Sequence, residues 1–259
     1  KTDQAEKYYN KALPLAKESG DSLLIGTVYN NLASVHKRRG NHSDALENYQ
    51  QALNYYKNKR YRAITLSNIG GIYTELNLYD KALEYHNRSL KVRKEMGSVY
   101  SLANIYNQIG VVQSNLANYD QALVSYKQAL DNSRQASTPK LTSQILNNLG
   151  VLYKKLGEYD QAIDYYEQSL AMREEISGPS DIARTTNNLG QLYWDQGNKE
   201  EAANYYRKAL TLREQVGNPY DIASSLNSML RLTVDQEDYK QAAIYANRLK
   251  MMGDSTDSY

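Results

Sequence analysis

The chain contains no cysteine or phenylalanine and very little histidine or proline. Its 259 residues include no Cys, no Phe, three His and four Pro. The absence of cysteine excludes disulfides, catalytic thiolates and cysteine-ligated metal sites, and it leaves the redox compartment open. The histidines, His36, His42 and His86, are too scattered to form a metal-binding motif. We therefore expect no metal ion and no cofactor.

Charge and hydropathy argue against two further classes of partner. Lys and Arg total 31 against 29 Asp and Glu, and a net charge of +2 creates no field that would attract nucleic acid. No apolar run approaches the roughly 20 residues that a membrane-spanning helix requires, and Lys1 opens no signal-peptide pattern. The mean hydropathy of −0.73 suits a soluble protein with much surface for its volume. We expect a cytoplasmic protein with neither nucleic acid nor membrane as partner.

The strongest pattern that is present is an internal repeat of about forty residues. A pair of apolar and small residues recurs at spacings of 37, 40, 40, 40 and 40, as Leu32-Ala33, Ile69-Gly70, Ile109-Gly110, Leu149-Gly150, Leu189-Gly190 and Met229-Leu230. Twelve residues after each pair stands an alanine, namely Ala45, Ala82, Ala122, Ala162, Ala202 and Ala242. Apolar and small positions lie three and four residues apart, which indicates helices and not strands.

Turn residues divide each period into two helices. Segments such as "LANYD" and "LGEYD" lie within a period, and joints such as "SGPSD" lie between periods. Small residues at Gly150 and Ala162 are expected to let the two helices approach closely, with Tyr153 and Tyr166 filling the space around them. We interpret these positions as structural and not as part of a binding site.

The repeated unit resembles the tetratricopeptide repeat. Leu149-Gly150, Tyr153, Gly157, Tyr159, Ala162 and Tyr166 match the pattern of that family within one unit. The usual repeat has about 34 residues, and the longer unit here, with "LNNLG" and joints such as "GPSDIAR", is most similar to the kinesin light chain type. The resemblance implies an all-α fold, an α-solenoid of stacked antiparallel helix pairs in a right-handed superhelix. It leaves the function open, because such arrays serve many systems.

The repeat boundaries predict a single superhelical domain over residues 1–253. Its repeats are expected at about 20–57, 58–97, 98–137, 138–177, 178–217 and 218–253, followed by a flexible tail at 254–259. Residues 1–19 match only the second helix of a repeat, with Ala5 and Tyr9 in the positions of Ala162 and Tyr166. This unpartnered helix suggests that more repeats or another domain precede Lys1, and it offers a surface for self-association.

Asparagine recurs at two adjacent positions of the first helix, although it is a weak helix former. We name Asn30, Asn107, Asn147, Asn187 and Asn227 the first amide register, and Asn31, Asn68, Asn148 and Asn188 the second amide register. In arrays of this kind the first helices line the concave groove. An amide side chain offers two donors and an acceptor, so it can pair with the main chain of an extended peptide.

Two interpretations of the registers remain open. Either at least one register faces the groove, or both are structural and bond to neighbouring helices. Kinesin light chain repeats, which the chain resembles, use groove asparagines for cargo peptides, and by this analogy Asn107, Asn147 and Asn187 are the better candidates. Neither register contains Lys or Arg, which argues against the clamp by which chaperone-tail receptors of this family hold a terminal carboxylate.

Variable positions on the same helix face are expected to set selectivity. Together with the first amide register and Asn68, the predicted peptide-binding residues are Lys37, Arg38, Lys154, Arg184, Gln191 and Trp194. The basic residues outnumber Glu75 and Asp195, so we expect an acidic protein or peptide as ligand, unless these charges are simply solvated. Trp194 has the chemistry of a binding hot spot, although half-buried packing explains it equally well.

Catalysis has little support in the sequence. There is no recognisable Ser-His-acid pattern and no Gly-rich phosphate loop, and His86 falls on an aromatic packing position. We expect no enzyme but an interaction scaffold that binds an extended peptide in its groove. The alternative is a regulatory or sensor module that controls an attached effector domain in a larger signalling protein.

Overall fold

Helices account for nearly all of the described chain. The computed structural model describes residues 2–256, with side chains for residues 2–253, and over this range there are thirteen α-helices and no strand. The helices are α1 (Thr2–Ser19), α2 (Ser22–Arg38), α3 (His42–Tyr55), α4 (Lys59–Glu75), α5 (Tyr79–Met96), α6 (Val99–Asn115), α7 (Tyr119–Gln135), α8 (Pro139–Leu156), α9 (Tyr159–Ile176), α10 (Pro179–Asp195), α11 (Lys199–Val216), α12 (Pro219–Asp235) and α13 (Tyr239–Thr256). The all-α prediction is confirmed.

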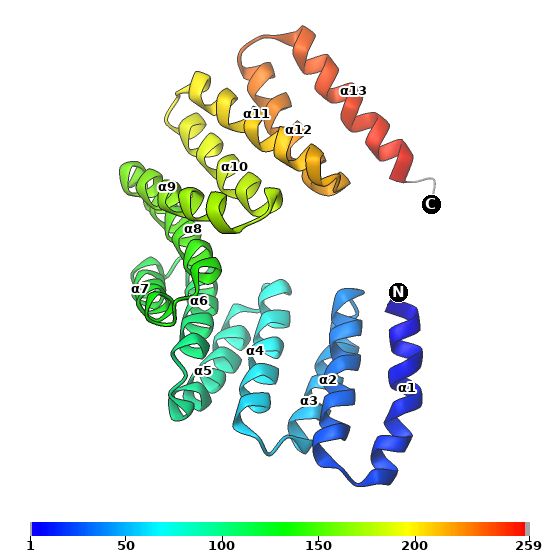
Figure 1. Cartoon of the computed structure of the whole chain (residues 1–259). Coiled ribbons are helices and arrows are strands. Elements are labelled where there is room, and N and C mark those ends of the chain that lie inside the picture. The colour runs from blue at the N-terminus through cyan, green and yellow to red at the C-terminus, as the bar shows by residue number, and fades with distance from the viewer. Residues whose placement is uncertain (1, 257–259) are drawn as a thin grey trace. The chain divides into compact units, whose positions relative to one another are not determined.

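The chain forms two compact units, Lys1–Ser137 and Thr138–Tyr259. The first contains α1 to α7 and the second contains α8 to α13 (Figure 1). Their border coincides with a predicted repeat boundary, and the single domain over residues 1–253 stays a prediction. Helix α13 continues to Thr256, so the predicted tail at 254–259 begins as helix, and residues 257–259 lie outside the described residues.

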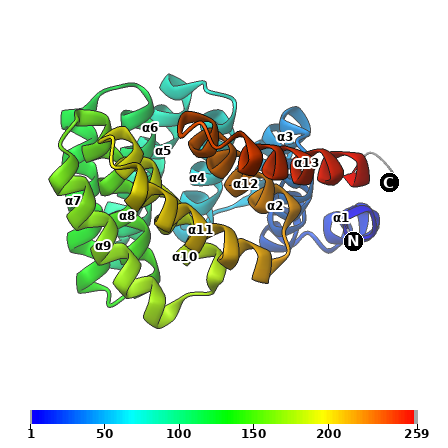
Figure 2. The same ribbon diagram turned by 90° about the horizontal axis from the view of Figure 1, so that it is seen from above.

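Within each unit, consecutive helices pack as pairs. Contacts join α2 to α3, α4 to α5 and α6 to α7 in the first unit, and α8 to α9, α10 to α11 and α12 to α13 in the second (Figures 1 and 2). The second helix of a pair also packs against the first helix of the next pair, as α5 does with α6 and α11 with α12. This is the arrangement that the forty-residue period predicts.

A glycine in the first helix of a pair allows its second helix to approach closely. A Cβ atom on this glycine would come within 2.6–2.7 Å of the ring sixteen residues later, in the pairs Gly70 with His86, Gly110 with Tyr126, Gly150 with Tyr166 and Gly190 with Tyr206. The alanines that recur twelve residues after each repeated pair are all buried. The structural role predicted for the glycine and alanine positions is therefore confirmed.

Paired tyrosines form a second contact between the helices of most pairs. The ring centroids lie 5.2 Å apart for Tyr153 and Tyr165, and 5.4 Å apart for Tyr193 and Tyr205. Tyrosine suits such half-buried positions because its ring packs while its hydroxyl can stay hydrated. These repeated contacts account for part of the 25 tyrosines.

Helix α1 packs against α2 and carries exposed apolar side chains. Tyr8 is 61% exposed and Leu15 is 65% exposed, and Arg39 at the end of α2 forms ion pairs with Asp3 and Glu6 of α1. The first helix is thus held both by packing and by charge. Self-association through its outer face stays a prediction.

Candidate functional site

The predicted site residues all lie on the first helices of the pairs. In the first unit they are Asn30, Lys37 and Arg38 on α2, Asn68 on α4 and Asn107 on α6. In the second unit they are Asn147 and Lys154 on α8, Arg184, Asn187, Gln191 and Trp194 on α10, and Asn227 on α12. Each unit therefore carries its own set of candidate residues.

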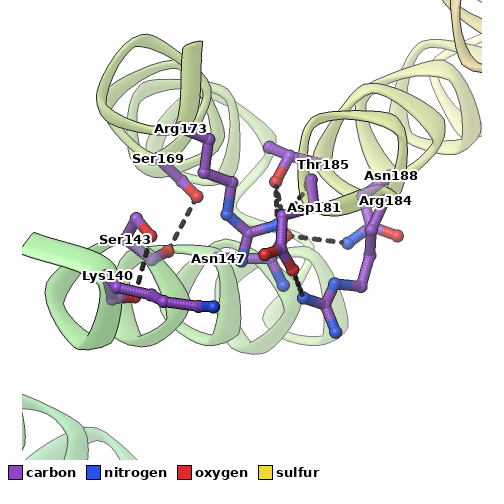
Figure 3. Close-up of polar contacts among 9 residues, drawn as sticks. All are labelled: Lys140, Ser143, Asn147, Ser169, Arg173, Asp181, Arg184, Thr185 and Asn188. Carbon is purple, nitrogen blue, oxygen red and sulfur yellow. Dashed lines mark hydrogen bonds and ion pairs between the residues drawn. The ribbon is translucent and has the colours of Figure 1, made fainter. Parts of the chain in front are cut away.

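Asn147 bridges two consecutive repeats. It is only 5% exposed, and its amide oxygen accepts hydrogen bonds from the Thr185 hydroxyl and from Nδ2 of Asn188, both at 3.1 Å (Figure 3). Both donors belong to α10, whereas Asn147 belongs to α8. Two donors occupy both lone pairs of a carbonyl oxygen, so this oxygen has no capacity left for a ligand.

The same kind of bridge recurs in the first unit. The Thr65 hydroxyl of α4 donates to the amide oxygen of Asn30 in α2 at 3.4 Å. Ser67 occupies the first-register position of α4. Its hydroxyl donates a hydrogen bond to the amide oxygen of Gln108 in α6. First-register positions thus repeatedly connect one repeat to the next.

Burial argues against two of the first-register asparagines as peptide-binding residues, and the prediction for this register stays a prediction. Asn107 is 5% exposed, as is Asn147. Asn187 is half-buried, and its buried amide oxygen has no hydrogen-bond partner among the described residues. Only Asn227 is exposed. At Asn107 and Asn147 the burial therefore favours the structural interpretation.

The second amide register is more accessible. Asn68 is half-buried, and its side chain makes no hydrogen bond within the described chain. Asn188 is also half-buried and donates one amide hydrogen to Asn147, which leaves its amide oxygen without an internal partner in the same range. These two amides retain hydrogen-bonding capacity that a ligand can use.

A buried arginine lies at the centre of the Asn147 bridge. Arg173 of α9 is 1% exposed, and its Nη1 donates to the main-chain oxygen of Asp181 at 2.6 Å and to the Thr185 hydroxyl at 2.8 Å (Figure 3). Burial lowers the pKa of Arg173 to about 10, so the guanidinium is still charged at neutral pH. Helices α8, α9 and α10 are thereby joined by one chain of hydrogen bonds.

This arginine position recurs and was not singled out in the sequence. Arg93 donates to the main-chain oxygen of Ser101 at 3.0 Å, and Arg213 donates to that of Asp221 at 3.1 Å. In each case the acceptor lies eight residues later, at the start of the next repeat. The forty-residue spacing of Arg173 and Arg213 is the signal that could have revealed this role.

One pocket of the first unit brings predicted site residues together. It has a volume of about 570 Å³ and is lined by Ser34, Lys37, Arg38, Tyr49, Asn68 and Glu75. We name it the α2–α4 pocket, because all of these residues except Tyr49 lie on α2 or α4. The hydroxyls of Ser34 and Tyr49 lie 3.1 Å apart and share a hydrogen bond.

Ion pairs neutralise most of the positive charge predicted for the groove. Nζ of Lys37 lies 3.0 Å from a carboxylate oxygen of Glu75, and Nζ of Lys154 lies 2.9 Å from one of Asp195. Arg184 is paired with Asp181. Arg38 is exposed and forms no ion pair within the described chain. The expected basic surface is therefore reduced to a local excess around Arg38.

Gln191 and Trp194 pack against their neighbours in the second unit. Gln191 donates to Asp195 at 2.8 Å and accepts from the Tyr206 hydroxyl at 3.2 Å. Trp194 is half-buried with its ring edge-on to Tyr206 at a centroid distance of 6.3 Å, and the Arg231 guanidinium lies 4.8 Å from the indole centroid. These contacts favour the packing interpretation of Trp194.

The repeated geometry has a counterpart among known families. The tetratricopeptide repeat model matches residues 1–58, 61–135, 141–215 and 181–249. The chain belongs to the tetratricopeptide repeat family. The fold of this family is typically a non-catalytic scaffold for protein interactions, and the helix pairs described above have that architecture.

Solved tetratricopeptide repeat structures share this fold at low sequence identity. BtubC (BKLC) from P. vanneervenii is 22% identical with a TM-score of 0.73, and the match covers 84% of this chain and 92% of BtubC. A Rap protein complexed with Competence and Sporulation Factor is 16% identical with a TM-score of 0.68, covering 92% of this chain and 77% of Rap. Comparison with curated proteins gave no match.

A third structure contains a tetratricopeptide repeat array as one part of a longer chain. It is a Signal Transduction ATPase with Numerous Domains protein from Pyrococcus horikoshii, described as having a tetratricopeptide repeat sensor. It is 19% identical with a TM-score of 0.78, and the match covers 97% of this chain but only 38% of that protein. The structural similarity is therefore limited to a part of that protein.

The described residues offer neither a metal-binding cluster nor a membrane-spanning helix. Among the described residues, no group of three or more His, Asp or Glu side chains is placed to hold a metal ion. The helices in that same part of the chain include none long and apolar enough to cross a bilayer.

Proposed function

We propose that the chain binds an extended peptide segment of a partner protein on the face formed by its first helices. The observation that carries this proposal is the α2–α4 pocket, where Lys37, Arg38 and Asn68 converge on one polar opening. The pocket is wide enough for a side chain, and Asn68 contributes donors and an acceptor that the protein itself does not use. A solved relative by fold, the Rap protein, is complexed with Competence and Sporulation Factor.

The second amide register supplies the main-chain recognition in this proposal. A half-buried amide can donate to a peptide carbonyl and accept from a peptide N–H at once, whatever the peptide side chains are. Asn68 in the first unit and Asn188 in the second have this capacity. The first amide register then positions the second, because the amide oxygen of Asn147 accepts a hydrogen bond from Nδ2 of Asn188 and fixes the orientation of that side chain.

A regulatory role is the second candidate. The Signal Transduction ATPase with Numerous Domains relative carries its repeat array as a sensor, and this chain corresponds to only part of that protein. In such a role, peptide binding would act on an attached effector domain. The two candidates share the same binding step and differ in its consequence.

A peptide selection with the full chain tests the binding step. We expect a library of displayed random dodecapeptides to yield binders, and Asn68→Ala to weaken a selected peptide by about 10-fold, since one amide makes two or three hydrogen bonds. Asn54→Ala removes an exposed asparagine from the second helix α3 and should leave binding unchanged. Failure to select any binder, or equal affinity of the two variants, would contradict the proposal.

A further inference from the structure

We infer that the α2–α4 pocket is a subsite for one acidic side chain, Asp or Glu, of the bound peptide. This inference rests on the proposed function and adds the chemical class of the residue that the peptide must present. It follows from the charges, the open space and the unused hydrogen-bonding groups of this one pocket.

The charges of the pocket leave one positive group without a partner. Lys37 and Glu75 form an ion pair at 3.0 Å across the pocket, so they compensate each other. Arg38 lines the same pocket and has no acidic partner within the described chain. A guanidinium binds a carboxylate through two parallel hydrogen bonds, which is its preferred geometry.

Gly71 leaves open space next to Lys37, one of the residues that line the pocket. A Cβ atom on Gly71 would lie 3.6 Å from Nζ of Lys37 and would meet no other neighbouring group within 4 Å. The corresponding position carries Val111, Val151 and Gln191 in later repeats. Glycine inside a helix costs roughly 0.5–1 kcal/mol relative to alanine, and no close helix contact requires it here, unlike at Gly70.

Polar groups around the opening complete the recognition. Ser34 and Tyr49 also line the pocket, but Ser34 donates its hydroxyl to the main-chain oxygen of Asn30 at 2.9 Å and Tyr49 shares a hydrogen bond with Ser34, so neither hydroxyl serves the ligand. The Asn68 amide lines the pocket without an internal hydrogen bond, and together with the Arg38 guanidinium it provides the donors of the opening. This is what a carboxylate requires, because an ionised carboxylate only accepts hydrogen bonds.

The charge balance favours a carboxylate over a phosphate. The pocket carries a single uncompensated positive charge, which matches one carboxylate. A phosphorylated residue carries about −1.5 to −2, and it would face Glu75 with charge left over. A side-chain carboxylate can also enter from the middle of an extended peptide.

Peptide selection on the full chain tests the subsite. Displayed random dodecapeptides, flanked on both sides so that no free carboxyl terminus is present, should yield binders that share one Asp or Glu. For a selected peptide, replacing that residue with its amide should weaken binding roughly 10- to 100-fold, as expected for loss of a charge-assisted hydrogen bond. Arg38→Gln should remove this discrimination, so that both peptides bind it equally.

Two matched variants separate the pocket from the general surface charge. Arg60→Gln removes an exposed arginine at the opposite end of α4 and should preserve the preference for the acidic peptide. Gly71→Val places in this repeat the residue found at positions 111 and 151, and it should weaken the acidic peptide without lowering the thermal midpoint. Circular dichroism melting of each variant provides the folding control.

The outcomes distinguish the subsite from the proposed function. Binders that share no acidic residue, or a preference that survives Arg38→Gln, would overturn the subsite while peptide binding itself stands. Tighter binding of a phosphoserine peptide, or of a peptide whose only carboxylate is its free terminus, would also overturn it. If no peptide is selected, both proposals fail together.

Discussion

The ring of Tyr166 lies directly against the backbone of Gly150, so closely that a Cβ atom on Gly150 would come within 2.6 Å of the ring. Gly150 is in α8 and Tyr166 is in α9, and both are buried. The contact fixes the distance between the two helices of the pair. The same contact recurs in three other pairs, where a Cβ atom on the glycine would come within 2.7 Å of the ring.

Replacing Gly150 should therefore destabilise the protein. We expect Gly150→Val to lower the free energy of unfolding by about 1–3 kcal/mol, because the added side chain forces the Tyr166 ring or the helix to move. Urea unfolding followed by circular dichroism measures this change. Gly71→Ala is the control, since Gly71 lies in a helix interior with open space beside it. Equal effects of the two replacements would mean that the ring contact is not the cause.

Asn147 should also be important for stability. Asn147→Ala leaves the hydroxyl of Thr185 and Nδ2 of Asn188 without their acceptor, and unpaired buried donors cost about 1–3 kcal/mol. Asn227→Ala, at the same register position but exposed, should change the unfolding free energy far less. If both variants unfold at the same urea concentration as the parent, the inter-repeat bridge contributes nothing.

His86 should make the stability depend on pH. Its imidazole is buried against Gly70, and burial, together with the nearby charge of Arg93, lowers its pKa from 6.5 to about 4. The unfolded chain takes up a proton as the pH falls through 6.5, whereas the folded chain does so only near 4. The protein should therefore keep its full stability above pH 6.5 and lose up to about 3 kcal/mol of it between pH 6.5 and 4.

His86→Tyr provides the matched comparison for this effect. Tyrosine is the residue at the same position in four other pairs. In three of them it packs against a glycine, and in the fourth Tyr49 lies in one buried cluster with Ala33. We expect the difference in unfolding free energy between the variant and the parent to grow in favour of the variant as the pH falls to 4. A difference that is the same at pH 7.5 and pH 4.5 would rule out His86 as the source.

Arg173 should stabilise the folded protein through hydrogen bonds that lysine cannot form. Arg173→Lys keeps the charge but loses the planar guanidinium that donates to both Asp181 and Thr185. We expect a loss of about 1–3 kcal/mol in the free energy of unfolding. Arg207→Lys, on the exposed face of α11, should have little effect. Similar unfolding curves for the two variants would argue against the bridge.

The periodic part of the fold could be predicted because it depends on local spacing. The anchors from Leu32-Ala33 to Met229-Leu230 repeat at nearly constant intervals, and each helix pair follows from residues within one period. Gly150 and Tyr166 lie sixteen residues apart, within reach of such a pattern. The architecture of the helix pairs could therefore be predicted from the sequence.

The orientation of the amide side chains was harder to predict from the sequence, because it depends on contacts between periods. Asn147 is bonded to residues 38 and 41 positions later. Adjacent positions on a helix point about 100° apart, so a small change in how two repeats pack decides which register is buried. Likewise, the sequence identified both Lys37 and Glu75 as groove residues. Their ion pair, which joins positions 38 residues apart, could not be predicted from the sequence.

The open space beside Lys37 lies where α4 has glycine at a position that holds valine in α6 and α8. In that hairpin the glycine makes no close helix contact, unlike its neighbour Gly70. An array of this type can thus acquire or close a recognition point by exchanging a single residue per hairpin, which lets its binding preferences diverge while its architecture is inherited unchanged.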